Sequence, residues 1–473
     1  MRRWLKPLKR WLILGHRWLG IATGLFLAAW VLSGLVMLYV AFPALTDAER
    51  LSYLTPIAWE RVIFGPDAAL ARVGLEPAPD GLSLAMRGPE PVYQVTTRDG
   101  ARHVVSAETG TVFGEIDARA ALAAFGRHAS VRAVTRDQWT VRDRYDPVRP
   151  FHVVALHDAA GTELYVSART GSVVLDTTRR ERLWNWLGAI PHWFYPTPLR
   201  ARAELWRGVL LWVSGVAIAG ALSGLVLGIW RLRLRRPYAS GAVTPYRGLG
   251  RWHHLFGVVG GISLVTFVAS GWLSMNPNHW FTPRMPSAAM REAYAGPAAP
   301  VTRETLSGIP LSGIVEVRIG RVDGRPVLVA ADARSRRVVV APPSPVAVMA
   351  AAGRALPGAG IAGTQTLTAY DAYWYPHHDT RPLPVLRVRF DDPAATWLHI
   401  DPESGALLDR LDASGRLQRW LFEAAHRLDF AILTQARPAW DLVMWLLNGL
   451  GAGIALTGVA LGWRRLRRPA RAG

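Results

Sequence analysis

The sequence contains no cysteine among its 473 residues. Disulfides, iron–sulfur clusters, thiolate-ligated haem and covalently attached c-type haem are therefore excluded. Any metal site has to use the 13 histidines, carboxylates or tyrosines. The sequence also lacks a phosphate-binding loop and a dinucleotide fingerprint between a strand and a helix, since its Gly257–Gly261 cluster lies inside an apolar run.

Acidic residues are few, with 35 Asp and Glu against 55 Lys and Arg, which gives a net charge of +20. Half of the residues are hydrophobic, and the mean hydropathy of +0.14 is high for a soluble protein. The positive charge clusters at the ends of apolar runs. This pattern is typical of membrane topology rather than of a nucleic-acid-binding face, so no nucleic-acid partner is expected.

Four apolar stretches are long enough to cross a bilayer, which takes about 20 helical residues. Basic segments precede the first stretch, follow the second and follow the fourth. The positive-inside rule then predicts a multi-pass protein of the bacterial inner (cytoplasmic) membrane with both termini in the cytoplasm. The predicted stretches are Trp11–Val40, Leu205–Trp230, Leu255–Met275 and Trp440–Trp463.

The predicted fold class is an integral-membrane, α-helical four-span bundle with two periplasmic α+β domains and an internal duplication. The first span is too long for the core of a signal peptide, which has about 7–15 residues. The predicted division is a cytoplasmic N-terminus with the first span (1–41), a first outer domain (42–204), the second span (205–231), a cytoplasmic loop (232–251), the third span (252–275), a second outer domain (276–439), the fourth span (440–463) and a cytoplasmic tail (464–473).

Both outer segments alternate short β-like runs with turn signals. Val92–Gly100, Glu163–Gly171 and Thr396–Gly405 each end in a glycine that suits a tight turn. Each outer segment is therefore expected to form a small α+β module.

The chain repeats itself at a shift of 234 residues. Arg182–His192 reappears as Arg416–His426 without a gap, and each copy precedes an apolar span. The first and third spans also match, at a shift of 237, which aligns His16 with His253. Ser33-Gly34 then falls on Ser270-Gly271.

Four histidines thus occupy repeat-related positions. His16 and His253 lie at the cytoplasmic ends of spans one and three, and His192 and His426 lie on the outer side before spans two and four. Neutral imidazole is a good axial ligand of haem iron, and a pseudo-twofold duplication supplies one ligand to each side of the ring. The pattern predicts two haem b groups, one near each face of the membrane.

Alternatives remain at the level of the residues. His254 neighbours His253 and is the alternative inner ligand, although it aligns with Arg17. Interfacial histidines can also extend to lipid headgroups, and the glycines of the spans can simply pack helices. Arg17, Arg200, Arg251 and Arg427 are candidates for pairing with haem propionates.

The second outer segment contains a loop that is rich in aromatic residues and histidines. Tyr373, Trp374, Tyr375, His377 and His378 are candidates for contact with an iron chelate or a metal, and a structured loop is the alternative. No catalytic residue is assigned.

The motifs around the paired histidines resemble the PepSY-associated transmembrane helix family of bacterial inner-membrane proteins. The resemblance rests on His16-Arg-Trp-Leu-Gly20, on His253-His-Leu-Phe-Gly257, on the Thr-Gly turns after strands, and on the Trp-Leu…His segments before spans two and four. It covers nearly the whole chain. It implies PepSY-like outer domains and the activity of a haem-containing siderophore reductase.

The implied reaction is transfer of electrons across the membrane to a periplasmic ferric siderophore, with release of ferrous iron. The chain has no cytoplasmic nucleotide-binding domain, so a quinol or a separate cytoplasmic flavin or NAD(P)H reductase is the expected donor. Trp30, Trp212 and Trp445 are expected between the two haems. The main rival is a non-enzymatic module that binds a peptide, protease or siderophore. A metal transporter is a third possibility, which the scarcity of carboxylates in the spans disfavours.

Overall fold

The computed structural model describes residues 2–75, 79–125, 128–297, 299–310, 312–376 and 380–467. Within these ranges, four helices are long and apolar enough to cross a membrane, as the sequence predicted. α9 begins inside the segment expected to be the loop 232–251, so the connection between the second and third long helices is shorter than predicted. The four helices are α1 (Arg2–Met37), α8 (Ala203–Arg231), α9 (Gly248–Ser274) and α15 (Arg437–Leu466).

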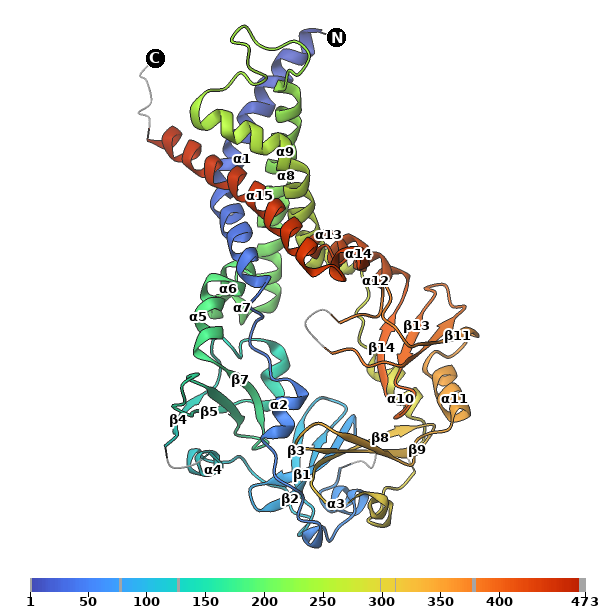
Figure 1. The fold of residues 1–473 in the computed structure, drawn as a ribbon. Helices are drawn as coiled ribbons and strands as arrows, with labels where there is room; N and C mark the ends of the chain where they lie inside the picture. Colours follow the sequence, from blue (N-terminus) through green and yellow to red (C-terminus); the bar gives the residue numbers. More distant parts are fainter. Residues whose placement is uncertain are drawn as a thin grey trace.

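The four long helices form one bundle, in which α1 and α9 each pack against α8 and α15 (Figure 1). Small residues allow the helices to approach closely. A Cβ added at Gly260 of α9, for example, would lie 2.7 Å from Leu450 Cβ of α15. The bundle core consists of Leu27, Ala28, Val31, Ala217, Leu264, Val268 and Ala455.

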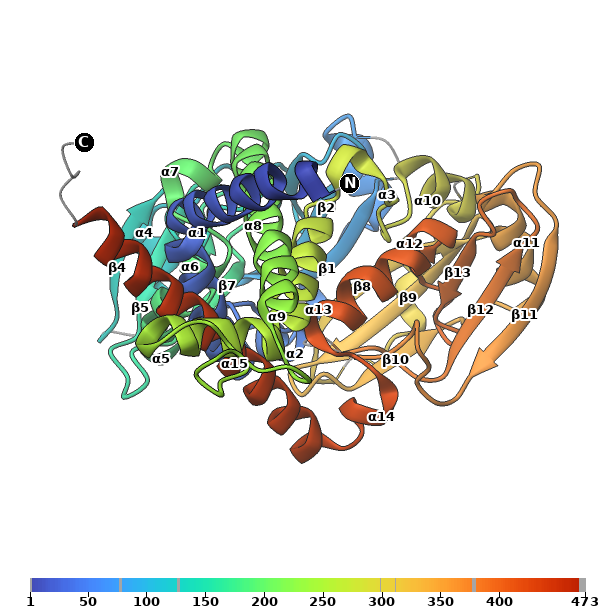
Figure 2. The same cartoon turned by 90° about the horizontal axis from the view of Figure 1, so that it is seen from above.

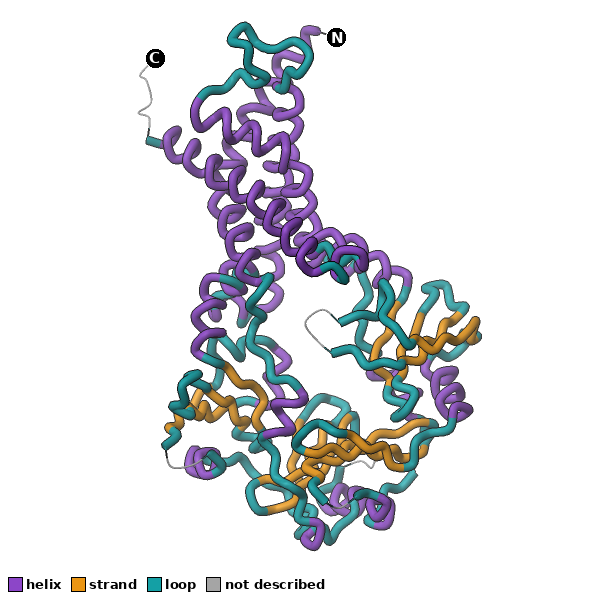
Figure 3. The backbone as a smooth tube through the Cα atoms, viewed as in Figure 1, coloured by secondary structure: helices purple, strands orange, loops and turns teal. Residues whose placement is uncertain are grey.

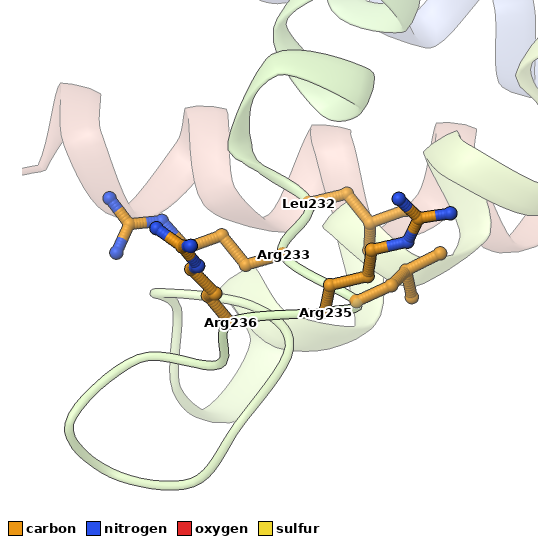
Figure 4. A pocket seen from close by; sticks show the side chains of 5 residues that line it. Leu232, Arg233, Arg235 and Arg236 are labelled. Atoms are coloured by element: carbon orange, nitrogen blue, oxygen red, sulfur yellow. The ribbon is translucent and has the colours of Figure 1, made fainter.

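The two ends of the bundle differ in structure. The start of α1, the loop between α8 and α9 and the end of α15 lie at one end, and the strands lie beyond the other (Figures 1 and 3). In the α8–α9 loop, Arg233, Arg235 and Arg236 line a shallow surface pocket (Figure 4). We call the arginine-rich end the inner end and the end that faces the strands the outer end.

Three antiparallel sheets form in the part of the chain that the structure describes. Two of them have four strands in simple sequential order, one from each outer segment. They comprise β4 (Ser130–Val134), β5 (Phe151–Ala155), β6 (Glu163–Ser167) and β7 (Val173–Thr177), and then β11 (Ile361–Leu367), β12 (Val385–Phe390), β13 (Trp397–Ile400) and β14 (Leu407–Leu411).

The third sheet joins the two outer segments, with strand order β10-β9-β8-β1-β2-β3. β1 pairs with β8 in antiparallel register, with Leu84 opposite Val317, and one hydrophobic core runs beneath both. Each outer segment thus forms a four-stranded sheet of its own and also contributes three strands to this shared sheet. Its strands are β1 (Gly81–Arg87), β2 (Glu90–Thr96), β3 (Arg102–Ser106), β8 (Ile314–Val322), β9 (Arg325–Asp332) and β10 (Arg337–Val340).

The predicted strand–turn units are confirmed. β6 and β13 lie within their runs, and β2 begins at Glu90, two residues before its run. The glycines that close the runs, Gly100, Gly171 and Gly405, have positive φ angles of 84°, 75° and 66°. Glycine adopts this backbone conformation without a steric penalty.

Short helices cover the sheets and connect them to the bundle (Figure 2). Two connecting series, α5–α7 and α12–α14, lead from the four-stranded sheets into α8 and α15. The short helices are α2 (Asp47–Ser52), η1 (Trp59–Arg61), α3 (Pro66–Arg72), α4 (Ala118–Ala123), η2 (Asp143–Val148), α5 (Arg179–Leu187), α6 (Ala189–His192), α7 (Thr197–Arg200), η3 (Pro277–His279), α10 (Ala288–Ala295), η4 (Glu304–Gly308), α11 (Pro345–Ala355), α12 (Ala413–Gln418), the π-helical η5 (Arg419–Ala424), α13 (Ala425–Arg427) and α14 (Ala431–Thr434).

An ion pair stabilises the shared sheet, and its removal is our first prediction. Arg50 of α2 donates two hydrogen bonds of 2.7 Å to Glu316 of β8, whose side chain is buried. Replacing Glu316 with Gln removes the buried carboxylate and leaves Arg50 only its 2.9 Å pair with the more exposed Asp47, so the free energy of unfolding should fall by about 3 kcal/mol. Chemical denaturation of the full chain in detergent, followed by circular dichroism, measures this change.

The matched control is Glu292→Gln, because Glu292 pairs with Arg98 at 2.8 Å on the exposed surface. Exposed pairs contribute at most about 1 kcal/mol. Equal effects of the two substitutions would show that the Arg50–Glu316 pair does not stabilise the shared sheet.

Candidate functional site: two facing histidine pairs

The four repeat-related histidines meet in two pairs inside the bundle. The ring centroids of His16 on α1 and His253 on α9 are 6.2 Å apart, and their planes differ by 31°. Those of His192 on α6 and His426 on α13 are 6.1 Å apart, and their planes differ by 65°. The structure therefore brings together the same residues that the sequence paired.

Each ring is held by a neighbouring helix through the same three groups, as His192 illustrates. Its Nδ1 lies 3.0 Å from the Trp30 carbonyl oxygen and 3.2 Å from Ser33 Oγ, both on α1. The ring edge rests on Gly34, where an added Cβ would lie 3.4 Å from His192 Cε1. We call this set, a carbonyl at position i, a hydroxyl at i+3 and a glycine at i+4, the histidine-holding motif.

The motif occurs once on each long helix. His426 Nδ1 lies 3.0 Å from its carbonyl oxygen, and His16 and His253 Nδ1 lie 3.1 Å from theirs. The duplication has thus kept the partners of each histidine as well as the histidine. The other three motifs are Phe267, Ser270 and Gly271 for His426, then Gly220, Ser223 and Gly224 for His16, and Ile454, Thr457 and Gly458 for His253.

These contacts fix which ring nitrogen carries the proton. Each hydroxyl donates to a carbonyl of its own helix, as Ser270 Oγ does to Thr266 at 2.6 Å, so it accepts from the imidazole. Nδ1 then faces only acceptors and carries the proton, which leaves the lone pair on Nε2. Within the described ranges, no hydrogen bond engages the Nε2 atom of any of the four rings.

Facing imidazoles with free Nε2 lone pairs are suited to a metal that takes two protein ligands. In the part of the chain that the structure describes, no group of three or more His, Asp or Glu side chains could hold a metal ion. A metal bound here would need its remaining ligands from a non-protein group. Burial lowers the pKa of His192 and of His426, which favours the neutral, ligating form of each ring.

His254 lies outside the inner pair. Its Nε2 is 3.0 Å from the Gly228 carbonyl oxygen of α8, and its ring contacts Tyr246 at 5.3 Å between centroids. The side chain is buried and its Nε2 is engaged by α8, whereas the ring of His253 lies beside that of His16, so the geometry favours His253 as the inner partner.

The surroundings of the outer pair differ between the two copies. Near His192, Arg142 stacks on Phe42, Trp193 and Tyr195. Arg200 stacks on Trp206. Near His426 two of the corresponding positions are charged, because Arg427 aligns with Trp193 and Asp429 aligns with Tyr195.

The charged group near His426 lies on η5, α13 and the following loop. Arg427 pairs with Glu423 at 3.6 Å and with Asp429 at 3.3 Å. Burial raises the pKa of the Asp429 carboxyl, and Arg427 opposes this rise. Of the arginines proposed for propionates, Arg427 directly follows His426 and Arg200 stacks on Trp206, whereas Arg17 and Arg251 are exposed.

The aromatic loop of the second outer segment divides into different environments. Trp374 is only 1% exposed and stacks on His399 at 4.8 Å, so it is a core residue with no surface for a docked chelate. The Tyr375 hydroxyl lies 2.9 Å from Glu423 and 3.1 Å from Asp429, which connects the loop to the surroundings of His426. Tyr373 accepts a hydrogen bond from Trp420, and His377 and His378 lie outside the described residues.

Of the three tryptophans expected between the pairs, Trp30 packs against the bundle core, and the other two do not. Trp212 is 78% exposed and Trp445 is 51% exposed, so both point out of the bundle. Trp30 contributes its carbonyl to the histidine-holding motif. The leucine, valine and alanine residues of the bundle core lie between the pairs.

Sequence reasoning found the four histidines and the Ser-Gly pairs of α1 and α9, but it missed Ser223-Gly224 and Thr457-Gly458. A search for a hydroxyl residue followed by glycine in every span would have found them.

No protein-family model matches this chain, and a search of curated proteins finds no match either.

The histidine-holding motif predicts the effect of a single added methyl group. A Cβ at position 224 would lie 2.5 Å from His16 Cε1, so Gly224→Ala must displace the ring or the helix. Overpacking of this kind costs about 1–3 kcal/mol of stability. Thermal unfolding in detergent, followed by tryptophan fluorescence, should show a lower Tm.

Gly20→Ala on α1 is the matched control, because nothing lies within 4 Å of its added Cβ. Alanine is the better helix former, so this variant should be neutral or more stable. A Gly224→Ala variant as stable as Gly20→Ala would refute the close packing of His16 on Gly224.

Proposed function

We propose that this chain is a haem b-containing reductase of the bacterial inner membrane that passes electrons to a periplasmic ferric siderophore and releases ferrous iron. The observation that supports it is the pair of facing, Nε2-free imidazoles at each end of one bundle. The PepSY-like nature of the outer domains and the siderophore substrate rest on the resemblance of the sequence motifs.

The dimensions of both pairs suit an axially ligated haem. Bonds from imidazole nitrogen to a metal are about 2 Å long, so two imidazoles that hold one metal ion would have ring centroids at most about 6.4 Å apart. The observed separations are 6.2 and 6.1 Å. A porphyrin supplies the four further ligands that the described side chains lack, and haem iron, when bound, supplies one-electron transfer.

The chain's own groups prepare the ligands and exclude water. The Nδ1–H bond to a backbone carbonyl fixes the ring orientation and raises the basicity of Nε2. A glycine beside each ring removes the side chain that would otherwise fill the space. The apolar core between the pairs keeps water from the interior of the bundle.

The two pairs lie at depths that suit transfer across a membrane. His253 and Gly271, which contacts His426, are 18 residues apart on α9, or about 27 Å at 1.5 Å per residue. The hydrocarbon core of a bilayer is about 30 Å thick. One redox group at each pair would thus lie near each surface.

The charge distribution supports the proposed orientation. Segments 1–17, 231–251 and 464–473 are rich in arginine and contain no Asp or Glu. The positive-inside rule assigns this end, with both termini, to the cytoplasm and the sheets to the periplasm. The donor is then a membrane quinol or a cytoplasmic flavin or NAD(P)H reductase.

Haem content tests the site one histidine at a time. Protein purified from haem-replete cells should show a reduced-minus-oxidised haem b spectrum and two haems per chain. Alanine at His16, His253, His192 or His426 should leave one haem, because each variant removes one of two axial ligands. Pyridine haemochrome absorbance against protein concentration measures the ratio.

His254→Ala is the control and should keep both haems, because His254 binds the backbone of α8. A colourless wild type would overturn the reductase function and favour the non-enzymatic module. Two haems in the His192 or His426 variant would overturn the outer pair alone.

Electron delivery tests the substrate class. Dithionite-reduced protein in nanodiscs, mixed anaerobically with a ferric hydroxamate or ferric catecholate siderophore, should be reoxidised while a ferrous chelator traps Fe(II). Stopped-flow haem absorbance and chelator colour follow the two products.

The His192→Ala variant, which should retain the inner haem only, is expected to lose most of this rate. Reoxidation at the wild-type rate in that variant, or reoxidation without trapped Fe(II), would contradict the proposed path to the outer surface.

A further inference from the structure

The repeated segment that ends at His192 and His426 exposes an apolar face in both copies. On α5, Leu183, Trp186 and Leu187 are 62%, 55% and 62% exposed. Their counterparts 234 residues later, Leu417 of α12 with Trp420 and Leu421 of η5, are 52%, 42% and 39% exposed. Spacings of three and four residues place each set on one side of its helix.

The opposite side of each helix is polar and buried, which reverses the usual order in a soluble protein. Asn185 is 1% exposed and donates hydrogen bonds of 2.9 Å to the carbonyls of Ala41 and Glu181. Its repeat counterpart, Arg419, is 3% exposed and donates to the carbonyls of Ala372 and Asp429. Both copies thus bury the polar residue and expose the leucines and the tryptophan.

We propose that these two faces, Leu183–Leu187 and Leu417–Leu421, lie in the outer leaflet of the membrane at the boundary between headgroups and acyl chains. The proposal rests on the membrane location given above. Leucine and tryptophan on one side of a short helix, with Arg179 and Arg180 at its start, are the residues that interfacial helices use.

The arrangement of the two faces favours lipid over a protein partner. α5 and α12 lie on different sides of the outer end of the bundle in both views (Figures 1 and 2). A bilayer surrounds the bundle and contacts both faces with the same chemistry, whereas a single partner protein would have to reach both sides. The long helices also expose apolar side chains, such as Trp212 and Ile262, as lipid-facing surfaces do.

The interfacial helices would fix the depth of the outer histidine pair. His192 and His426 each follow the last leucine of their face by five residues and bind the carbonyls of α1 and α9. Lipid contact on one side and the histidine-holding motif on the other then keep the pair at the edge of the hydrocarbon core.

Single-cysteine labelling tests the proposal directly, because the chain has no native cysteine. Leu183→Cys, Leu187→Cys and Leu417→Cys carry a nitroxide in full-length protein in phosphatidylcholine–phosphatidylglycerol nanodiscs. Collision rates with oxygen, which concentrates in lipid, and with a water-soluble nickel chelate give the depth of each label. Circular dichroism and size-exclusion chromatography check each variant for folding.

Two matched positions calibrate the depth scale. Ile262 of α9 is 67% exposed on the bundle, and Val346 of α11 is 78% exposed beside the sheets, so the controls are Ile262→Cys and Val346→Cys. The three test labels should fall between these controls, with oxygen collisions several-fold more frequent than at position 346. This result would hold whether or not haem is bound.

The outcomes separate this proposal from the proposed function. Nickel collisions at positions 183, 187 and 417 as frequent as at position 346 would overturn the interfacial helices while position 262 still reports lipid. Low collision rates with both reagents would indicate a protein partner or a second copy, and would also overturn it. A nickel-accessible label at position 262 would refute the membrane location itself, and with it both proposals.

Discussion

The hydrogen bond from a histidine Nδ1–H to a backbone carbonyl of the neighbouring helix is the interaction on which the rest of the site depends. In an α-helix the side chain of residue i+4 lies over the carbonyl of residue i, so glycine at i+4 uncovers that carbonyl. The hydroxyl at i+3 adds a second acceptor, as Ser33 does for His192. One short pattern thereby sets the position of the ring, its tautomer and the direction of its free lone pair. Because the same hydrogen bond joins each histidine to a second helix, the position of the ring and the packing of the bundle cannot change independently.

Duplication converts this local pattern into two sites. One copy supplies a histidine at each depth, and the second copy supplies the histidine that pairs with it. The outer segments follow the same logic, because β1 pairs with its own counterpart β8 and the two copies share a core. The halves are therefore joined twice, between the helices of the bundle and in the six-stranded sheet. A chain with only one copy would leave its histidines without partners and the edge of β1 unpaired.

The sequence predicted the features whose signals are local. The length of the apolar runs predicted the four long helices, and glycines in turns, such as Gly171, predicted where the strand–turn units end. The repeat identified the two histidine pairs before any contact was known. The shared sheet was missed because the pairing of β1 with β8 joins residues more than 200 positions apart, and neither strand encodes its partner. Trp212 and Trp445 were placed wrongly because a helix that is apolar all round gives no indication of which side faces its neighbours.

The two copies carry the same paired histidines, but the residues around these histidines differ between the copies. For the proposed function this difference matters, because identical axial ligands give no direction to electron flow. Charge, burial and hydrogen bonding near a metal site set its potential, and at the outer pair these differ from one side to the other. The His192 side is aromatic around Arg142, whereas Glu423, Arg427 and Asp429 lie by His426. The four histidine-holding motifs are thus the same in both copies, whereas the residues next to the outer pair differ. For the proposed function, any difference in potential between the inner and outer sites would have to come from these neighbouring residues. The same holds for any difference between the membrane side and the outer-domain side of a pair.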